Sequence, residues 1–253
     1  MRLLLLGHGR MGQLVEALAA EYNATIVEVL THDAASRLAE ADFTNVDVAI
    51  DFTLAAAVPQ HLPLLAERKI NVVIGTTGWA ASEAAMREVV ARSGIGVMAA
   101  ANFSLGMNLF QLAVEDAARR FASQPSFGAW IHELHHAAKK DAPSGTAVQL
   151  QAAMQRAGYT HTIDVSSTRA GAIPGTHTVG FDGPADTVTL THTVRDRAVF
   201  ARGALEAARW LNGRRGWFTM RDMLDEQASG VRPQGSGPRL TTCEPDLPDS
   251  GPR

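Results

Sequence analysis

The chain has 253 residues, of which 46% are hydrophobic and 19% are charged, a balance typical of one large or two modest globular domains. Its formal net charge of −3 predicts no basic surface for nucleic acid or for an anionic membrane, so we expect neither as a partner. The only cysteine, Cys243, excludes an intrachain disulfide and a thiolate metal cage, which fits a reducing cytoplasm.

The N-terminal apolar run covers residues 3–6 and ends at Gly7. It is shorter than the roughly 7–15 residues of a signal-peptide core, and no run in the chain approaches the ~18 apolar residues of a membrane helix. We therefore expect a cytoplasmic protein.

The first hundred residues predict strands that alternate with helices. Apolar or β-branched runs predict strands at 3–6, 25–30, 46–52, 71–74 and 96–100. Helical spacing of apolar residues predicts helices at 11–21, 55–68 and 82–92, the last with Ser82 as its N-cap. Because strands that alternate with helices form a parallel sheet covered on both faces, we expect a Rossmann-like, doubly wound nucleotide-binding unit.

The pattern changes after residue 101. Helices are predicted at 105–121 and 146–157, and strands at 130–136, 162–168, 176–182 and 187–194. The last two strands are joined by residues 183–186, a hairpin-type connection, and consecutive strands indicate a mixed sheet. The predicted fold class is α/β, with a second α+β domain built on the mixed sheet. A helix at 198–212 and a short helix near 218–224 follow.

These elements predict two domains and a tail. The first domain spans 1–101 and is completed by the returning segment 198–225, and the second spans 102–197. Beyond residue 225, Gly, Pro and Ser make up 12 of the last 28 residues, and few large apolar side chains remain to offset the entropy of ordering. We expect residues 226–253 to form a disordered tail, and we expect no catalytic role for Cys243 within it.

A glycine-rich motif follows the first predicted strand. Gly7-His8-Gly9-Arg10-Met11-Gly12 matches G-x-G-x-x-G and opens a predicted helix, which is the context of a dinucleotide-binding loop. Gly7 permits a tight turn, Gly9 lets the backbone approach a pyrophosphate, and Gly12 lets the helix pack closely on the strand. A glycine-rich turn with a structural role is the alternative.

The ribose end of this predicted site is less defined. An acidic residue about 20 positions after the loop binds the adenine ribose in such folds, and Asp33 lies near that position. Thr31 and His32 are alternatives, because the end of the second strand is uncertain. Asp33 favours the free 2′-hydroxyl of NADH, whereas Arg37 could reach the 2′-phosphate of NADPH, so both cofactors stay open.

A second loop, Gly75-Thr76-Thr77-Gly78, follows the fourth predicted strand. Ligands of open α/β sheets bind at the carboxyl ends of the strands, so these small residues can approach a nicotinamide ring or a substrate carboxylate. An ordinary turn is an equal alternative.

Three histidines fall within five positions, and a metal site is one interpretation of them. Along a strand, His132 and His136 would face one way while Glu133 and His135 face the other, so no three ligands share a side. Two lysines follow directly and oppose a second cation. We therefore expect no metal.

The other interpretation is general acid catalysis combined with anion binding. A histidine can donate a proton near neutral pH, and Lys139 supplies positive charge. Residues 143–146 begin a helix whose free N–H groups suit a carboxylate. Together they predict a pocket for an anionic substrate that is protonated during the reaction, although a solvated basic loop before an ordinary helix cap is the plainer alternative.

These motifs resemble those of the dihydrodipicolinate reductases of bacterial lysine biosynthesis, also called 4-hydroxy-tetrahydrodipicolinate reductases. The similarity is strongest over residues 133–147, which contain His135-His136, Lys139 and Asp141-Ala142-Pro143-Ser144-Gly145-Thr146. Further matches, in chain order, are Gly9-Arg10-Met11-Gly12, Asp51-Phe52-Thr53, Gly75-Thr76-Thr77-Gly78, Ala101-Asn102-Phe103-Ser104, Arg169 with Gly171, Pro174-Gly175 with His177, and Phe200-Ala201 with Gly203-Ala204.

The resemblance covers roughly residues 1–225 and implies an activity. It implies reduction of 4-hydroxy-tetrahydrodipicolinate (dihydrodipicolinate) to tetrahydrodipicolinate by NADPH or NADH, in the diaminopimelate and lysine pathway. It also implies a homotetramer that forms through residues 102–197, which would bind the substrate as well.

Residue roles are implied in the same way. His135 would be the proton donor, and Lys139 the second donor or an anchor. The substrate dicarboxylate would be held by His136, Lys139, Ser144, Gly145 and Thr146, with Thr77 nearby. Cofactor contacts would come from Gly7, His8, Gly9, Arg10, Met11, Gly12, Gly75, Thr76, Thr77, Ala100, Ala101, Asn102 and Phe103.

Two rival functions make different demands on these residues. A non-catalytic NAD(P)-binding redox sensor would need the glycine loop but neither His135 nor Lys139. A metal-dependent hydrolase would use His132, His135 and His136 as ligands, and metal analysis of the purified protein would identify it.

Overall fold

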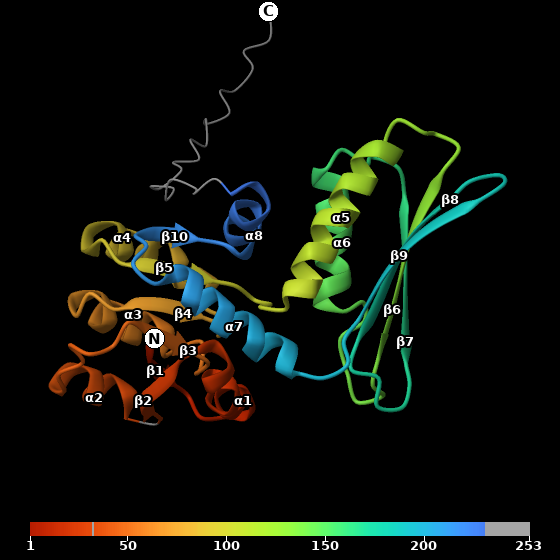
Figure 1. The fold of residues 1–253 in the computed structure, drawn as a ribbon. Coiled ribbons are helices and arrows are strands. Elements are labelled where there is room, and N and C mark those ends of the chain that lie inside the picture. The colour runs from red at the N-terminus through yellow and green to blue at the C-terminus, as the bar shows by residue number, and fades with distance from the viewer. Residues whose placement is uncertain (32, 231–253) are drawn as a thin grey trace, which may run out of the picture.

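The computed structural model describes residues 1–31 and 33–230, which form two β-sheets with helices packed against them (Figure 1). All pairings in the six-stranded sheet are parallel. Its strands, in spatial order, are β10 (Gly216–Phe218), β5 (Gly96–Ala99), β4 (Asn71–Ile74), β3 (Val48–Asp51), β1 (Arg2–Leu6) and β2 (Thr25–Leu30).

Both faces of this sheet are covered because successive side chains of β1 point to opposite sides. Leu3 and Leu5 pack in one core, and Leu4 and Leu6 pack in another. The first core is closed by α1 (Arg10–Leu18), its continuation η1 (Ala19–Tyr22), α7 (Ala198–Leu211) and α8 (Met220–Ser229). The second is closed by α2 (Ala34–Glu40), α3 (Val58–Glu67) and α4 (Glu83–Ser93), the last preceded by η2 (Ala80–Ser82).

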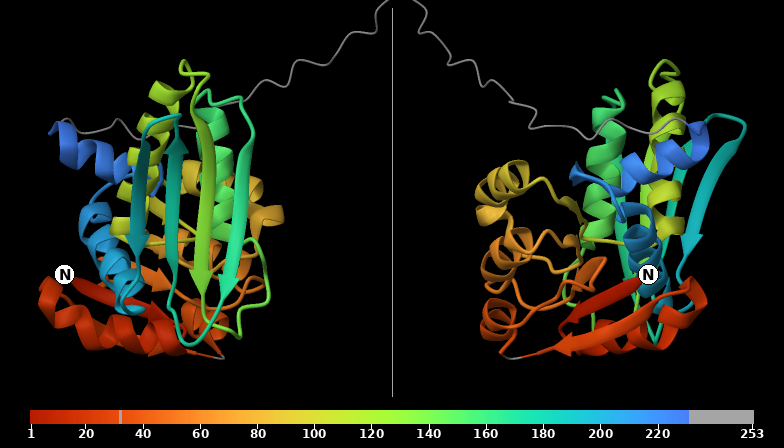
Figure 2. Two further views of the ribbon diagram at one scale, coloured as in Figure 1. Left: turned by 90° about the vertical axis from the view of Figure 1, so that its right-hand side faces the viewer. Right: turned by 60° about the vertical axis from the view of Figure 1, so that its left-hand side comes forward.

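The four-stranded sheet is mixed. Its strands, in spatial order, are β7 (Ile163–Arg169), β6 (Gly128–His135), β8 (Thr176–Asp182) and β9 (Thr187–Thr193). The β6–β7 pair is parallel, and the other two pairs are antiparallel. Two helices, α5 (Leu105–Phe121) and α6 (Gly145–Arg156), cover one face. The opposite face carries no helix from the described residues (Figure 2, left). The predicted fold class is confirmed.

Several element predictions need correction. The helix α2 and the strand β10 were not predicted. Helix α2 buries only two residues, Ala34 and Leu38, and β10 has only three residues, so neither shows a clear apolar period. Ser82 occupies the N-cap position of α4, but its side chain makes no cap hydrogen bond with the described residues. Helix α3 begins at Val58 rather than at 55.

The start of the predicted tail is also wrong. Helix α8 continues to Ser229, and a capping box between Thr219 and Asp222 fixes its start. Within it, Glu226 accepts a hydrogen bond from Arg214 at 2.7 Å. The rest of the predicted tail, 231–253 with Cys243, lies outside the described residues, as does His32. Among the helices of residues 1–31 and 33–230, none has the length and apolar character needed to cross a membrane.

Candidate active site

A cavity of about 630 Å³ lies between the glycine loop and the carboxyl end of β6. Met11 of the loop borders it on one side, and His135, His136 and Lys139 border it on the other. The remaining wall is formed by Ala172, Pro174, Val194, Asp196, Arg197 and Phe200. The structure therefore brings the predicted proton donor and the predicted dinucleotide loop to one cleft.

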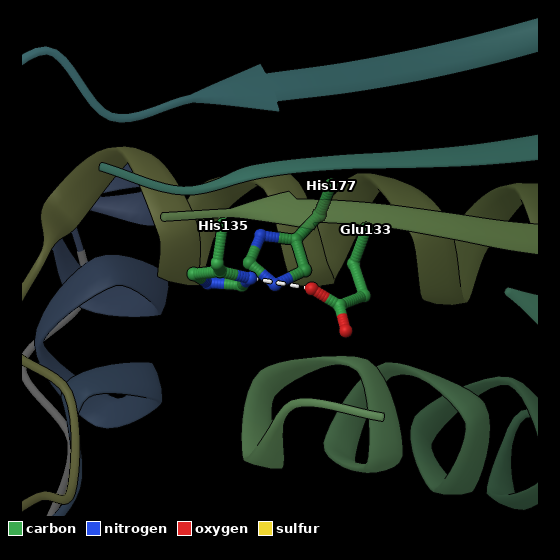
Figure 3. Close-up of side chains that lie close together, drawn as sticks. All are labelled: Glu133, His135 and His177. Atoms are coloured by element: carbon green, nitrogen blue, oxygen red, sulfur yellow. Dashed lines mark hydrogen bonds and ion pairs between the residues drawn. The ribbon is translucent and has the colours of Figure 1, made fainter. Parts of the chain in front are cut away.

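His135 is oriented by a carboxylate on its own strand. Residues of β6 alternate in burial, so Glu133 and His135 share the inner face, as the sequence predicted. The Nδ1 atom of His135 contacts the Oε2 atom of Glu133 (Figure 3). Because a carboxylate only accepts, Nδ1 carries the hydrogen and Nε2 is the atom left for a substrate. A methyl group on Gly175 would lie 3.1 Å from that Nε2 atom.

Glu133 is fully buried and held by a guanidinium. Arg169 donates to both of its oxygens, at 2.9 and 2.6 Å, and the backbone N–H of Ser144 donates at 3.1 Å. Burial by itself would raise the pKa of Glu133. Hydrogen bonds from Arg169, Ser167, His135 and Ser144 outweigh burial and lower that pKa to about 2. Glu133 is therefore a permanent negative charge behind His135.

His177 on β8 completes the buried cluster (Figure 3). Burial, followed by the charge of His135, lowers the pKa of His177 to about 4, so this ring is neutral at pH 7. The Ser144 hydroxyl lies 3.2 Å from the Nε2 atom of His177 and accepts from the Ala147 N–H. The Nδ1 atom of His177 is buried and finds no partner in the described chain.

The prediction of no metal site rested on residues 132–136 alone, and the fold adds His177 to them. With His177 included, Glu133, His135 and His177 place one ligand atom each within 4.8 Å of one another. Both oxygens of Glu133 already accept from Arg169, so a cation there would compete with a guanidinium. The prediction gave no role to Glu133, Arg169 and His177. The one feature of the sequence that could have identified them is that all three lie within the motifs quoted above.

The predicted substrate residues do not all line the same cavity. His136 and Lys139 lie beside His135, and the Lys139 Nζ atom pairs with Asp141 at 2.8 Å. Ser144 is the N-cap of α6, and both its N–H and its hydroxyl are engaged internally. Gly145 is exposed, and Thr146 borders a second cavity of about 360 Å³ together with Ala100, Ala101 and Asn102. Thr77 is exposed.

The glycine loop is tightly packed at Gly7 and Gly12 and open beside Gly9. A Cβ atom on Gly7 would lie 2.5 Å from the Phe52 carbonyl oxygen, and one on Gly12 would lie 2.1 Å from that of Gly7. Beside Gly9, by contrast, a Cβ atom would meet no described atom within 4 Å. Gly9 is also the N-cap of α1 and offers no capping side chain, so the first N–H groups of the helix are left for an anion.

The other predicted cofactor residues differ in exposure. His8 and Arg10 are exposed, and His8 contacts Glu16 at 2.7 Å. Thr76 and Phe103 are buried, whereas Gly75, Ala100 and Asn102 are partly exposed and Ala101 is exposed.

At the predicted ribose end, Asp33 is the exposed N-cap of α2, and Thr31 is exposed. Arg37 is paired with Glu28, with 2.8 Å between its Nε atom and the carboxylate.

The chain matches known proteins over nearly all of the described residues. The model described as "Dihydrodipicolinate reductase, N-terminus" matches residues 1–103, and the one described as "Dihydrodipicolinate reductase, C-terminus" matches residues 106–224. A 4-hydroxy-tetrahydrodipicolinate reductase from Stenotrophomonas maltophilia is 41% identical over 241 residues, which cover 88% of this chain and 98% of the relative. The enzyme of that name from Christiangramia forsetii is 34% identical over 237 residues, covering 89% and 98%.

A solved structure has the same fold. It is the dipicolinate-bound dihydrodipicolinate reductase from Paenisporosarcina sp. TG-14, with a TM-score of 0.75 and 23% identity, covering 87% of this chain and 97% of that one. The two family models and the close relatives, taken with the parallel and mixed sheets, establish that this chain belongs to the dihydrodipicolinate reductase family.

Proposed function

We propose that this chain is an NADPH- or NADH-dependent reductase that converts 4-hydroxy-tetrahydrodipicolinate to tetrahydrodipicolinate in diaminopimelate and lysine biosynthesis. The observation that carries the proposal is the Glu133–His135 pair, which opens on the cavity that Met11 of the glycine loop also borders. The conversion releases the 4-hydroxyl group of the substrate as water and adds a hydride and a proton to the ring, so the hydride donor and the proton donor must meet in one cleft. The names and coverage of the relatives support the same activity.

The residues of the glycine loop fit a dinucleotide. Gly7 and Gly12 are too tightly packed for a side chain, while the space beside Gly9 is open at the N-terminus of α1. When bound, the reduced nicotinamide supplies the hydride that the substrate ring accepts. The chain itself supplies the binding groups, the proton and the exclusion of water.

His135 holds the proton at its Nε2 atom. The permanent charge of Glu133 keeps Nδ1 as the donor to the carboxylate, so Nε2 is the atom that delivers the proton to a substrate in the cavity. Delivery of that proton leaves a neutral ring hydrogen-bonded to Glu133. A positioned general acid of this kind contributes roughly 10²–10⁴ in rate.

A lysine and a second histidine beside His135 fit an anionic substrate. His136 and Lys139 line the same cavity, and Lys139 can exchange Asp141 for a substrate carboxylate. Gly145 and Thr146, at the N-terminus of α6, would hold the second carboxylate through their N–H groups. Ser144 supports this site by capping the helix, because its own polar groups are already engaged.

The cofactor preference that these residues favour is NADH. Glu28 pairs with the guanidinium of Arg37 and would compete with a 2′-phosphate, and the Asp33 carboxylate would repel one.

We also propose a cytoplasmic homotetramer. Residues 1–101 and 198–225 would bind the cofactor, and residues 102–197 would bind the substrate and the other subunits. Support comes from the outer face of the smaller sheet, where Trp130, Leu134 and a ladder of threonines remain partly or fully exposed. Sedimentation velocity of the wild-type protein tests this proposal, and a monomer at micromolar concentration would contradict it.

The activity is tested by following NADPH and NADH oxidation at 340 nm with substrate formed in situ from aspartate semialdehyde and pyruvate. We expect oxidation by the wild type, and turnover roughly 10²–10⁴ lower in His135→Gln with cofactor binding retained. Cofactor binding without oxidation would instead favour the redox sensor. Metal bound to the purified protein would favour the hydrolase, whereas absence of metal with activity intact would remove it.

A further inference from the structure

A buried carboxylate lies beneath the loops that follow β3 and β4. Asp51, the last residue of β3, is 1% exposed. It accepts from the Thr53 N–H at 2.9 Å, the Thr53 hydroxyl at 2.6 Å, the Thr76 hydroxyl at 3.1 Å and the His61 Nδ1 atom at 3.0 Å. These donors come from three segments, namely the β3 loop, the β4 loop and α3. Asp51 therefore ties three separate parts of the chain to one point.

The loops held by Asp51 also pack on one another. A Cβ atom on Gly75 would lie 2.0 Å from the ring of Phe52, and one on Gly7 would lie 2.5 Å from the Phe52 carbonyl oxygen. Trp79 fixes the other side of the β4 loop, since its indole N–H donates to the Thr76 carbonyl at 2.8 Å. A shift of residues 52–53 would therefore move both the glycine loop and the 75–78 loop.

Fold stability alone does not call for a charge at this position. The other residues of β3, Val48, Ala49 and Ile50, are apolar and fully buried. Replacing a buried ion pair by apolar residues of similar volume is often neutral or stabilising, so an apolar residue could serve the core as well. The polar cluster instead lies at the carboxyl end of the sheet, where open α/β folds bind their ligands.

We propose that Asp51 and His61 are positioning residues for the nicotinamide cofactor. His61 is 4% exposed and acts through Asp51, which it keeps in place for Thr53 and Thr76. The pair thereby sets the spacing between the glycine loop and the 75–78 loop before any ligand binds. This inference rests on the proposed function only because that function identifies the ligand as a nicotinamide cofactor.

The amino end of β4, opposite the loops, provides a matched control. Asn71 is also buried, and its amide donates to the Leu211 carbonyl at 2.8 Å and accepts from the Gly96 N–H at 2.7 Å. Asn71→Leu replaces the amide by an apolar side chain of similar size and removes both hydrogen bonds, at the end of β4 away from the loops. Its loss should lower stability and leave the cofactor site intact, because it joins β4, β5 and the end of α7.

The test measures NADH affinity by fluorescence titration without substrate, and amide hydrogen exchange of residues 75–78 in the ligand-free protein. We expect His61→Leu to weaken NADH binding roughly tenfold, because the apparent Kd rises as the fraction of protein with the binding-competent loop spacing falls. Exchange at 75–78 should accelerate. His61→Asn, which restores a donor near the Nδ1 position, should recover affinity to within about threefold.

Should His61→Leu fail to fold, Thr53→Val removes one hydrogen bond to Asp51 at nearly constant shape and should show the same two effects in smaller degree. Unchanged affinity and exchange in His61→Leu or Thr53→Val would overturn the inference while leaving the proposed function standing. Equal weakening by Asn71→Leu would overturn it as well, since the effect would then follow stability. A wild type that binds neither NADH nor NADPH would overturn both.

Discussion

Substitution of Glu133 by glutamine separates the charge behind His135 from the shape of the site. Glutamine keeps the size of the side chain and one oxygen for Arg169, but it removes the negative charge that accepts from the His135 Nδ1 atom. We expect turnover to fall by roughly 10²–10⁴, the contribution of a general acid in its correct protonation state. Cofactor affinity should be unchanged, because Glu133 lies outside the glycine loop.

The same substitution should also lower the free energy of unfolding. The pKa of Glu133 falls from an ordinary 4.5 to about 2, which at ~1.4 kcal/mol per pKa unit corresponds to about 3 kcal/mol. Removing one partner of a buried ion pair costs a similar ~3–5 kcal/mol. Because the folded-state pKa is lowered, this stability is present above pH 4.5 and is lost as the pH falls toward 2.

A double-mutant cycle distinguishes the two effects. Urea unfolding at pH 7 gives the stability, and steady-state oxidation of NADH gives the activity, for Glu133→Gln, His135→Gln and the double variant. If Glu133 acts through His135, the double variant should be about as inactive as His135→Gln alone. Turnover of a folded Glu133→Gln enzyme within about threefold of the wild type would refute the reasoning, since the general-acid contribution exceeds that range.

Three further predictions concern other parts of the site. Burial and the His135 charge lower the pKa of His177 from 6.5 to about 4, so the stability that the neutral ring contributes is full above pH 6.5 and is lost as the pH falls toward 4. Urea unfolding of the wild type should show a loss of about 3 kcal/mol over this pH range, and His177→Gln should lose less. Glu28→Gln should release Arg37 and lower the KM for NADPH relative to NADH, and an unchanged KM ratio would speak against that pair as a determinant. Gly175→Ala should reduce kcat at least about tenfold with the NADH Kd unchanged, because the added methyl group lies 3.1 Å from the His135 Nε2 atom; wild-type kcat would contradict that placement.

Periodicity and local motifs were sufficient for most of the fold. The four leucines of β1 indicate a strand buried on both faces, and the alternation along β6 placed Glu133 and His135 together on the inner face. The glycine loop was recognisable because a strand precedes it and a helix follows it. Each of these signals is local, so it survives without knowledge of the tertiary structure.

The contacts between distant segments were not predictable in the same way. His177 meets Glu133 only through the antiparallel register of β6 and β8, and Arg169 reaches Glu133 across 36 positions of the sequence. The Asp51–His61 pair likewise depends on how α3 packs against the sheet. No short-range pattern encodes such pairings. The motif positions quoted from the family resemblance included Asp51, Arg169 and His177, but gave them no role.

The alternation of β6 has a consequence for which sequence changes this protein can tolerate. Glu133 and His135 face inward because they are two residues apart, and they meet His177 because β6 and β8 keep one register. Inserting or deleting one residue within β6 before Glu133 would turn both side chains outward and bring His132 inward. Length changes in this family member should therefore be confined to its loops, while the strand accepts only replacements of one residue for another.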